Sequence, residues 1–271
     1  MAVFEKTYLI QPRPSPKMEE IFRALKQGWP EAEHCMQTVP SFGEKDLTVI
    51  WGLLQGCEQY MKEPWIFTDM PYNGRYNGDF EKSYWRWCYN GLHDNRMLNV
   101  PSDRFEKWNV NVKPWQNGDE IVILPSSNNM TRYSCRMDAE TWTNKMYEHV
   151  KANTNKKVRV RLKPRANGTS GPGVADVSIE EDLKNAHAVV TSCSLAGIDA
   201  LKMGVPVFTN VPEHNPAAWC SNTDFSKLNN PEYYDREHLF YNLAYKQYSI
   251  PEMRDGTCYE NSKLYLFDKS W

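Results

Sequence analysis

The sequence predicts an α/β protein made of two Rossmann-like domains, and three features lead to this prediction. Short apolar runs end in polar or turn residues, as parallel strands covered on both faces do. From residue 119 onward such runs alternate with single helical segments, which implies right-handed crossovers and a parallel sheet. No period of about 20 to 50 residues repeats, so solenoids and propellers are excluded.

The first domain is predicted to span residues 1–115. Apolar runs predict three strands, at 7–13, 47–54 and 64–72. Apolar residues at helical spacing predict one helix, at 18–29. The stretch 72–118 is dense in aromatic residues and Asn-Gly pairs, which favour tight turns, so we expect large loops with one or two short elements. Pro and Asn-Gly in 113–119 mark the linker to the next domain.

The second domain is predicted to span residues 116–235, followed by a helical tail at 236–271. Its expected elements are strands at 119–127, 157–164, 188–192 and 205–210, and helices at 139–154, 178–186 and 194–204. Two amphipathic helices are expected within 231–256, where Leu239, Phe240, Leu243 and Ala244 share one face and Pro251 opens the second helix. This tail is expected to pack back on the first domain.

Composition narrows the class of protein. Thirty-two basic and thirty-four acidic residues give a formal charge of -2, which argues against binding nucleic acid through a global positive field. The seven cysteines show no CxxC pair and no zinc-finger spacing, so we expect free thiols in a reducing cytosol and no metal site. With no apolar stretch of membrane-spanning length and no basic, apolar leader, a soluble cytoplasmic protein without a membrane partner is expected.

A candidate phosphate site lies in the segment 188–208. A hydrophobic strand runs into Ser192 and Ser194, and a helix with small residues such as Ala196 in its first turn follows at once. Hydroxyls and unpaired backbone N–H groups then meet at the positive end of a helix dipole, at the strand end where open α/β sheets bind ligands. Ser126, which ends the first strand of this domain, joins the set. The alternative is that a serine only caps the helix.

The strand at 157–164 carries alternating cations. Arg159, Arg161 and Lys163 project to one face, and a charged face in a buried strand requires an anionic partner. Arg161 and Lys163 lie nearest the carboxyl end and are predicted to bind a diphosphate. For Arg159 we favour the alternative of an edge strand with its charge in solvent.

Asp69 is the leading candidate for a general base. It follows an apolar strand and precedes a turn, so its carboxylate should reach the ligand-binding edge of the sheet. An ordinary cap or turn role is the alternative. His93, with Asp94 beside it, is the second catalytic candidate because imidazole titrates near neutral pH, although a lone loop histidine is more often inert.

Aromatic residues and arginines are interleaved between residues 72 and 96. Tyr72, Arg75 and Arg86 are predicted to contact an acceptor, since such residues stack on bases or sugars and hold phosphates, and the two arginines are expected at the surface. The alternative is that the aromatic side chains fill a small core beneath long loops.

The string EDLKNAHAVVTSCSLAGIDALKMGVPVF (181–208) resembles the donor-binding segment of GT-B glycosyltransferases of the capsule and lipopolysaccharide type. The resemblance implies two Rossmann-like domains with parallel sheets facing a cleft. In that arrangement 1–115 is the acceptor side and 116–235 binds a nucleotide-sugar co-substrate such as UDP-glucose. It also implies no cofactor and no bound metal at the diphosphate. Retaining and inverting chemistry both stay open.

Other segments, among them WIFTDMPYNGRY (65–76), are similar to bacteriophage proteins expected to share that fold. The phage setting implies an acceptor in double-stranded DNA, a hydroxymethylated pyrimidine, modified in the host cytoplasm. Two alternatives stay open: a glycosyltransferase of surface polysaccharide synthesis, and a catalytically silent nucleotide- or DNA-binding module.

Overall fold

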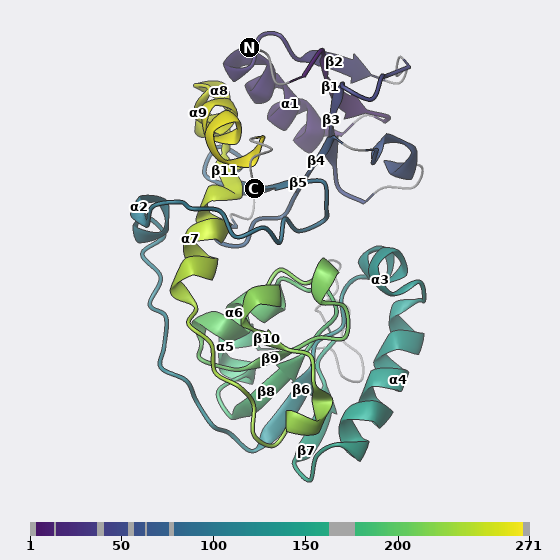
Figure 1. Cartoon of the computed structure of the whole chain (residues 1–271), viewed down its shortest axis with the longest axis vertical. Helices are drawn as coiled ribbons and strands as arrows, with labels where there is room; N and C mark the ends of the chain where they lie inside the picture. The colour runs from purple at the N-terminus through teal and green to yellow at the C-terminus, as the bar shows by residue number, and fades with distance from the viewer. Residues whose placement is uncertain are drawn as a thin grey trace. The chain divides into compact units, whose positions relative to one another are not determined.

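The computed structural model of the chain is shown in Figure 1. It describes residues 4–13, 15–36, 41–53, 57–62, 64–75, 79–162 and 177–267. The chain divides into two compact units: unit 1 is Met1–Trp108 with Phe240–Trp271, and unit 2 is Asn109–Leu239. The sequence placed these divisions a few residues away, after residues 115 and 235, and most of the expected tail is therefore the last part of unit 1.

Unit 1 is built on a six-stranded sheet with the order β11-β5-β4-β3-β1-β2. Its strands are β1 (Thr7–Gln11), β2 (Glu33–Met36), β3 (Leu47–Trp51), β4 (Trp65–Asp69), β5 (Tyr84–Tyr89) and β11 (Gln247–Ser249). Strands β1 to β4 pair in parallel, which confirms the three predicted strands. Strand β5 runs antiparallel to both β4 and β11, so the parallel part of this sheet is β1 to β4.

Helix α1 (Pro16–Gly28) covers one face of this sheet (Figure 1). It begins where Ser15 accepts the Met18 N–H and Pro16 occupies the first turn, both favourable at a helix start. Its apolar stripe packs on alternate residues of the central strands; the shared core includes Ile21, Phe22, Leu25, Leu9, Val49 and Ile66. Burial of that stripe, more than helix propensity, stabilises the helix.

The C-terminal segment completes unit 1. Its helices are α7 (Glu237–Tyr245), which contains the division between the units, α8 (Ile250–Arg254), α9 (Thr257–Asn261) and a π-helix (Ser262–Leu266); earlier in the chain lie the 3-10 helix Cys57–Tyr60 and α2 (Asp103–Glu106). Pro251 opens α8 as predicted. Helices α1 and α8 pack so closely that a Cβ atom on Gly28 would lie 2.1 Å from the Met253 carbonyl oxygen.

Unit 2 holds a five-stranded parallel sheet with the order β10-β9-β8-β6-β7. Its strands are β6 (Glu120–Ile123), β7 (Lys157–Val160), β8 (Ala186–Val190), β9 (Val207–Phe208) and β10 (Ser221–Asn222). The four predicted strands of this domain are confirmed, and β10 was not predicted. Apolar side chains of β6 and β8, among them Ile121, Ile123 and Val190, are fully buried.

The helices of unit 2 lie on both faces of its sheet, with α4 on one side and α5 and α6 on the other (Figure 1). They are α3 (Asn128–Cys135), α4 (Ala139–Ala152), α5 (Ile179–Asp182) and α6 (Ala196–Lys202), with 3-10 turns at Pro212–His214, Ala218–Cys220 and Phe225–Lys227. Helices α4, α5 and α6 match predicted helices, whereas α3 was not predicted. This is the doubly wound arrangement that the alternation of elements indicates.

Two expectations about the whole chain can also be compared with the structure. All seven cysteines are free, as their spacing predicts. None of the helices in the described ranges combines the length and the apolar character that a bilayer crossing needs.

Candidate functional site

The switch point of the unit 2 sheet brings two predicted residues together. Strand β7, which follows β6 in the chain, lies on one side of β6, and the next strand, β8, lies on the other side. Ligands of open α/β sheets bind at the carboxyl ends of strands at such a switch point. Ser126 follows β6 and Ser192 follows β8, and their Oγ atoms lie 3.1 Å apart. The predicted phosphate residues from two distant segments therefore share one place.

Ser192 itself is fully buried. Its carbonyl oxygen accepts a 2.6 Å hydrogen bond from Asn215 Nδ2 and a 3.2 Å bond from Thr209 Oγ1, so the loop after β9 braces the turn. Thr209 and Asn215 were not singled out from the sequence. Thr209 lies near the end of the predicted strand 205–210 and Asn215 shortly after it, and this position was the signal that could have found them.

The residues of this turn that reach the surface are Ser126 and Ser194, which are half-buried. Ser126 Oγ accepts the Cys193 N–H at 3.3 Å, and Ser194 Oγ accepts the N–H of Ala196, the first residue of α6, at 3.2 Å. Ser194 thus has the capping contact of the alternative interpretation. A ligand that binds at this turn would therefore contact the hydroxyls of these two serines.

Gly197, in the first turn of α6, faces the sheet. A Cβ atom on Gly197 would lie 3.4 Å from Thr191 Cγ2 and 3.7 Å from side chains of Ala217 and Val207. These are ordinary van der Waals distances, so the packing of α6 on the sheet does not require glycine at this position.

The predicted diphosphate cations are paired within the protein. Strand β7 is an edge strand, and Arg161 Nε lies 2.7 Å from Asp182 Oδ2. Arg159 contacts both Glu120 and Asp182, so its charge does not simply face solvent as we favoured. Lys163 lies outside the described residues. The diphosphate role of Arg161 stays a prediction, but Asp182 already balances its charge.

A third loop meets the Ser126–Ser192 turn from the end of α3. Ser134 Oγ lies 3.3 Å from Cys193 Sγ. Burial raises the pKa of the neighbouring Cys135 thiol, and that thiol also interacts with Ser192 and Glu213. The end of α3 therefore lies against both the β8 turn and the loop after β9.

Three side chains form the outer part of this meeting point. The Arg136 guanidinium lies 5.6 Å from the centre of the Tyr133 ring, and that ring meets the His214 ring edge-to-face at 5.5 Å. Burial lowers the pKa of His214, the Arg136 charge lowers it further, and Glu213 raises it. This group could not be predicted, because Tyr133 lies in α3 and Arg136 directly after it, and that helix was not predicted.

In unit 1 the structure brings together four of the predicted site residues. Arg86 Nη2 lies 3.5 Å from Asp69 Oδ2, and Arg86 Nη1 lies 3.0 Å from His93 Nδ1. Tyr72 Oη lies 3.3 Å from the same His93 nitrogen. Asp69 ends β4 at the carboxyl edge of the sheet and pairs in register with Arg86 of β5. About a quarter of the Asp69 side chain is exposed, whereas the other three residues are buried.

Burial changes what these residues can do. Arg86 is only 2% exposed, so the expectation that it lies at the surface is wrong, while Arg75 is exposed as expected. A guanidinium can only donate, so a His93 ring nitrogen that bonds to Arg86 must be the acceptor. Burial raises the pKa of Tyr72 well above its ordinary value. Asp69 is thus the member of the group that a substrate can reach.

A second layer of buried charge supports this group. Arg96 donates two hydrogen bonds to the Asp94 carboxylate, at 2.9 and 2.5 Å. Lys246, fully buried, donates to the Asp94 carbonyl oxygen at 2.7 Å. Burial would raise the pKa of Asp94, but the charges of Lys246 and Arg96 hold it below its ordinary value. The loop that carries His93 is therefore fixed by ion pairs.

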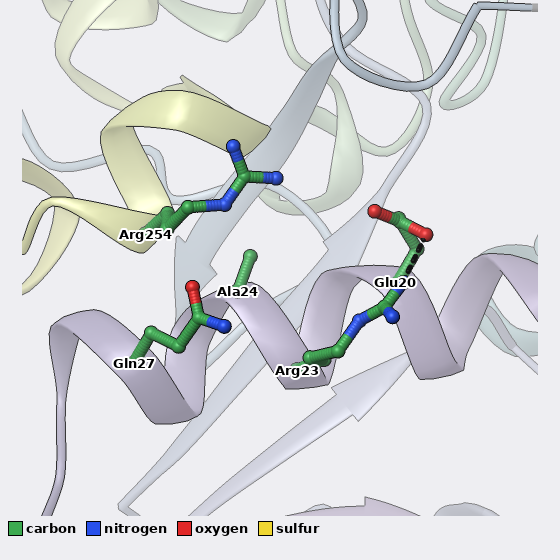
Figure 2. Close-up of a pocket in the computed structure, with 5 residues that line it drawn as sticks. All are labelled: Glu20, Arg23, Ala24, Gln27 and Arg254. Atoms are coloured by element: carbon green, nitrogen blue, oxygen red, sulfur yellow. Dashed lines mark hydrogen bonds and ion pairs between the residues drawn. The ribbon is translucent and has the colours of Figure 1, made fainter.

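Two surface hollows lie elsewhere in unit 1. Figure 2 shows the smaller, of about 250 Å³, between α1 and α8, with Arg23 paired to Glu20 at 2.6 Å. Arg254, on its other wall, is paired with Glu81. A wider hollow of about 760 Å³ runs along α1 beside β2. Neither contains a predicted site residue. In the described part of the chain no group of three or more His, Cys, Asp or Glu side chains is placed to hold a metal ion.

Comparisons with known proteins identify the fold. No protein-family model and no curated protein matches the chain. Among solved structures it is similar to the β-Kdo 2,7 transferase of KpsC from Thermosulfurimonas dismutans, with a TM-score of 0.55 and 13% identity over 94% of this chain and 99% of that one. The β-Kdo 2,4 transferase of the same KpsC matches with a TM-score of 0.51 and 11% identity over 90% and 92% of the two chains. The predicted GT-B-like α/β fold is confirmed.

Proposed function

We propose that this chain is a glycosyltransferase that moves a sugar from a nucleotide-sugar donor to an acceptor hydroxyl. The observation that carries the proposal is the convergence of Ser126 and Ser192 at the switch point of unit 2, in a chain whose fold follows two glycosyltransferases over almost its whole length. Fold likeness alone does not give an activity, so the proposal depends on this site.

Unit 2 is the proposed donor side. The hydroxyls of Ser126 and Ser194 lie at the carboxyl edge of the sheet, where a phosphate can accept their hydrogen bonds. The braced turn at Ser192 keeps the two hydroxyls in place before the ligand arrives. Preorganised donors of this kind stabilise the negative charge that develops on a departing nucleotide.

Unit 1 is the proposed acceptor side, with Asp69 as the general base. One oxygen of its carboxylate accepts the Met70 N–H at 2.7 Å, and the other lies 3.5 Å from Arg86. These contacts fix the orientation of the carboxylate while part of it stays exposed. Deprotonation of the acceptor hydroxyl is then a short-range proton transfer.

We propose a saccharide as the acceptor. Both similar structures are transferases of Kdo, an acidic sugar, and the chain has a net charge of -2. A hydroxymethylated pyrimidine in bacteriophage DNA stays a prediction from sequence resemblance, without support from these two structures. A DNA acceptor requires phosphate contacts, so its turnover should fall steeply with salt, whereas turnover of a neutral saccharide should change little.

Turnover of the full chain with UDP-, GDP- and CMP-linked sugars, CMP-Kdo included, tests the proposal. Each donor is offered with a saccharide acceptor and with hydroxymethylated duplex DNA. Release of the nucleotide with transfer to either acceptor is the expected result. If the wild type binds nucleotides but turns over none of these donors, the chain is a silent nucleotide-binding module.

Asp69→Asn tests the base. We expect kcat to fall about 100-fold or more with donor affinity unchanged, because general-base catalysis contributes about 10²–10⁴. Asp79→Asn is the matched control, since Asp79 is a partly exposed carboxylate of the same unit that pairs only with Lys82 among the described residues. Its turnover should stay within about twofold of wild type. Unchanged turnover in Asp69→Asn would remove the base assignment while leaving the transferase proposal intact.

A further inference from the structure

The backbone of Arg136 is unusual for its residue type. Among the described residues, three other than glycine have positive φ: Asn90, Asn109 and Arg136, the last with φ 55°. Asparagine visits the left-handed region readily, whereas other residues with a Cβ pay roughly 1–2 kcal/mol there. Arg136 ends α3, at a place where glycine is the usual residue. Arginine at this position therefore places a guanidinium at the end of α3 although its backbone is strained.

In the described part of the chain the Arg136 guanidinium forms no ion pair, and the side chain is exposed. Arg159 and Arg161 differ from it, since both are tied to acidic side chains of the protein. Of these three arginines, Arg136 is therefore the one whose charge can still attract an anion.

Arg136 lies beside the turn at Ser192, on the proposed donor side. The residues just before it, Ser134 and Cys135, contact Cys193 and Ser192 of that turn. Its guanidinium lies over the Tyr133 ring, and that ring contacts His214 of the loop after β9. Loops that follow the neighbouring strands β6, β8 and β9 thus place Arg136 next to the hydroxyls of the Ser192 turn.

We propose that Arg136, with Tyr133 and His214 beside it, binds the phosphate of the nucleotide that unit 2 takes up. This inference rests on the proposed function, and it replaces Arg161 with Arg136 as the principal phosphate cation. The guanidinium can bind two phosphate oxygens at once. Tyr133 holds the guanidinium from one side, and His214 adds a second nitrogen donor when it is protonated.

Arg136→Gly tests the proposal with little risk to folding, because glycine adopts the left-handed conformation without strain. Arg132→Gln is the matched control, which removes an exposed guanidinium from the same helix α3. Binding of UDP, CMP and inorganic pyrophosphate to the full chain is measured by calorimetry at two salt concentrations, with the unfolding midpoint of each variant recorded. We expect Arg136→Gly to bind at least tenfold more weakly, with a shallower salt dependence and an unfolding midpoint equal to or above wild type. Arg132→Gln should stay within about threefold of wild type.

The possible outcomes separate the two proposals. Wild-type affinity in Arg136→Gly, or an equal loss in both variants, would overturn the Arg136 assignment and leave the donor site of unit 2 standing. If the wild type binds neither nucleotides nor pyrophosphate, the proposed function fails and this inference fails with it. A selective loss in Arg136→Gly, with the fold intact, supports both.

Discussion

Lys246→Met is the sharpest test of the buried charges behind Asp69. Lys246 is 1% exposed, and its ammonium donates to the carbonyl oxygens of Asp94 and Arg96 and lies 3.7 Å from the Asp94 carboxylate. Burial lowers the pKa of Lys246, and the Asp94 charge raises it. Methionine has a similar length and no charge, so the substitution removes the three polar contacts while it keeps the volume of the stem.

The expected loss follows from these contacts. Each of the two carbonyl oxygens that lose their donor costs about 1–3 kcal/mol when buried and unpaired. Asp94 keeps its two hydrogen bonds from Arg96, so its charge is not left alone. The substitution also removes the cost of burying an ammonium, which is several kcal/mol, and this offsets part of the loss. We therefore expect Lys246→Met to destabilise unit 1 by about 2–4 kcal/mol.

The assay is urea unfolding together with hydrogen exchange of the segment 84–98. Lys45→Met is the control: Lys45 is an exposed lysine of the same unit, 3.4 Å from Glu5, and such surface pairs contribute roughly 0–1 kcal/mol. Exchange of 84–98 should accelerate in Lys246→Met and stay unchanged in Lys45→Met. A loss under about 1 kcal/mol, with normal exchange, would refute the view that the ammonium fixes the loop that carries His93.

Two further predictions concern packing and pH. Gly28→Ala should destabilise unit 1 by about 1–3 kcal/mol, because its Cβ would lie 2.1 Å from a backbone oxygen of α8. Gly43→Ala, whose Cβ would meet only Asp46 at 3.6 Å, should leave the melting temperature nearly unchanged, and equal shifts would contradict the packing argument. Burial and the Arg136 charge lower the pKa of His214, and a phosphate at Arg136 should raise it, so binding of UDP should take up a proton and weaken as pH rises from the pKa of His214 in the free chain toward its higher pKa in the complex. Calorimetry in buffers of different ionisation enthalpy measures that uptake, and its absence would separate His214 from the ligand.

The strands of unit 2 could be predicted because each is an apolar run followed by polar residues, which is a local signal. Strand β2 has the sequence EHCM, with no apolar run, and forms only through its pairing with β1. The direction of β5 is likewise not written in its own residues. It is set by pairing with β4 and with β11, which lies some 160 residues further along the chain. Non-local pairing of this kind is what a single sequence does not display.

The same distinction explains the site. The meeting of Ser126 with Ser192 could be predicted because the carboxyl ends of neighbouring parallel strands converge. The pairing of Arg161 with Asp182 could not, since it depends on how α5 packs beside β7. The role of Arg136 depends on still finer information, a backbone dihedral angle and the lack of an ion pair among the described residues.

The two sheets have switch points of the same kind, and their side chains differ in a way that favours unit 2 for the nucleotide. In unit 1 the edge at β1, β3 and β4 carries Gln11, Trp51 and Thr68, each with a buried polar atom that has no hydrogen-bond partner in the described structure. Trp51 places a large side chain at that edge. In unit 2 the corresponding edge carries the small Ser126 and Ser192, and the guanidinium of Arg136, beside them, forms no ion pair in the described part of the chain. A phosphate needs close approach and positive charge together, and the unit 2 edge offers both in these residues.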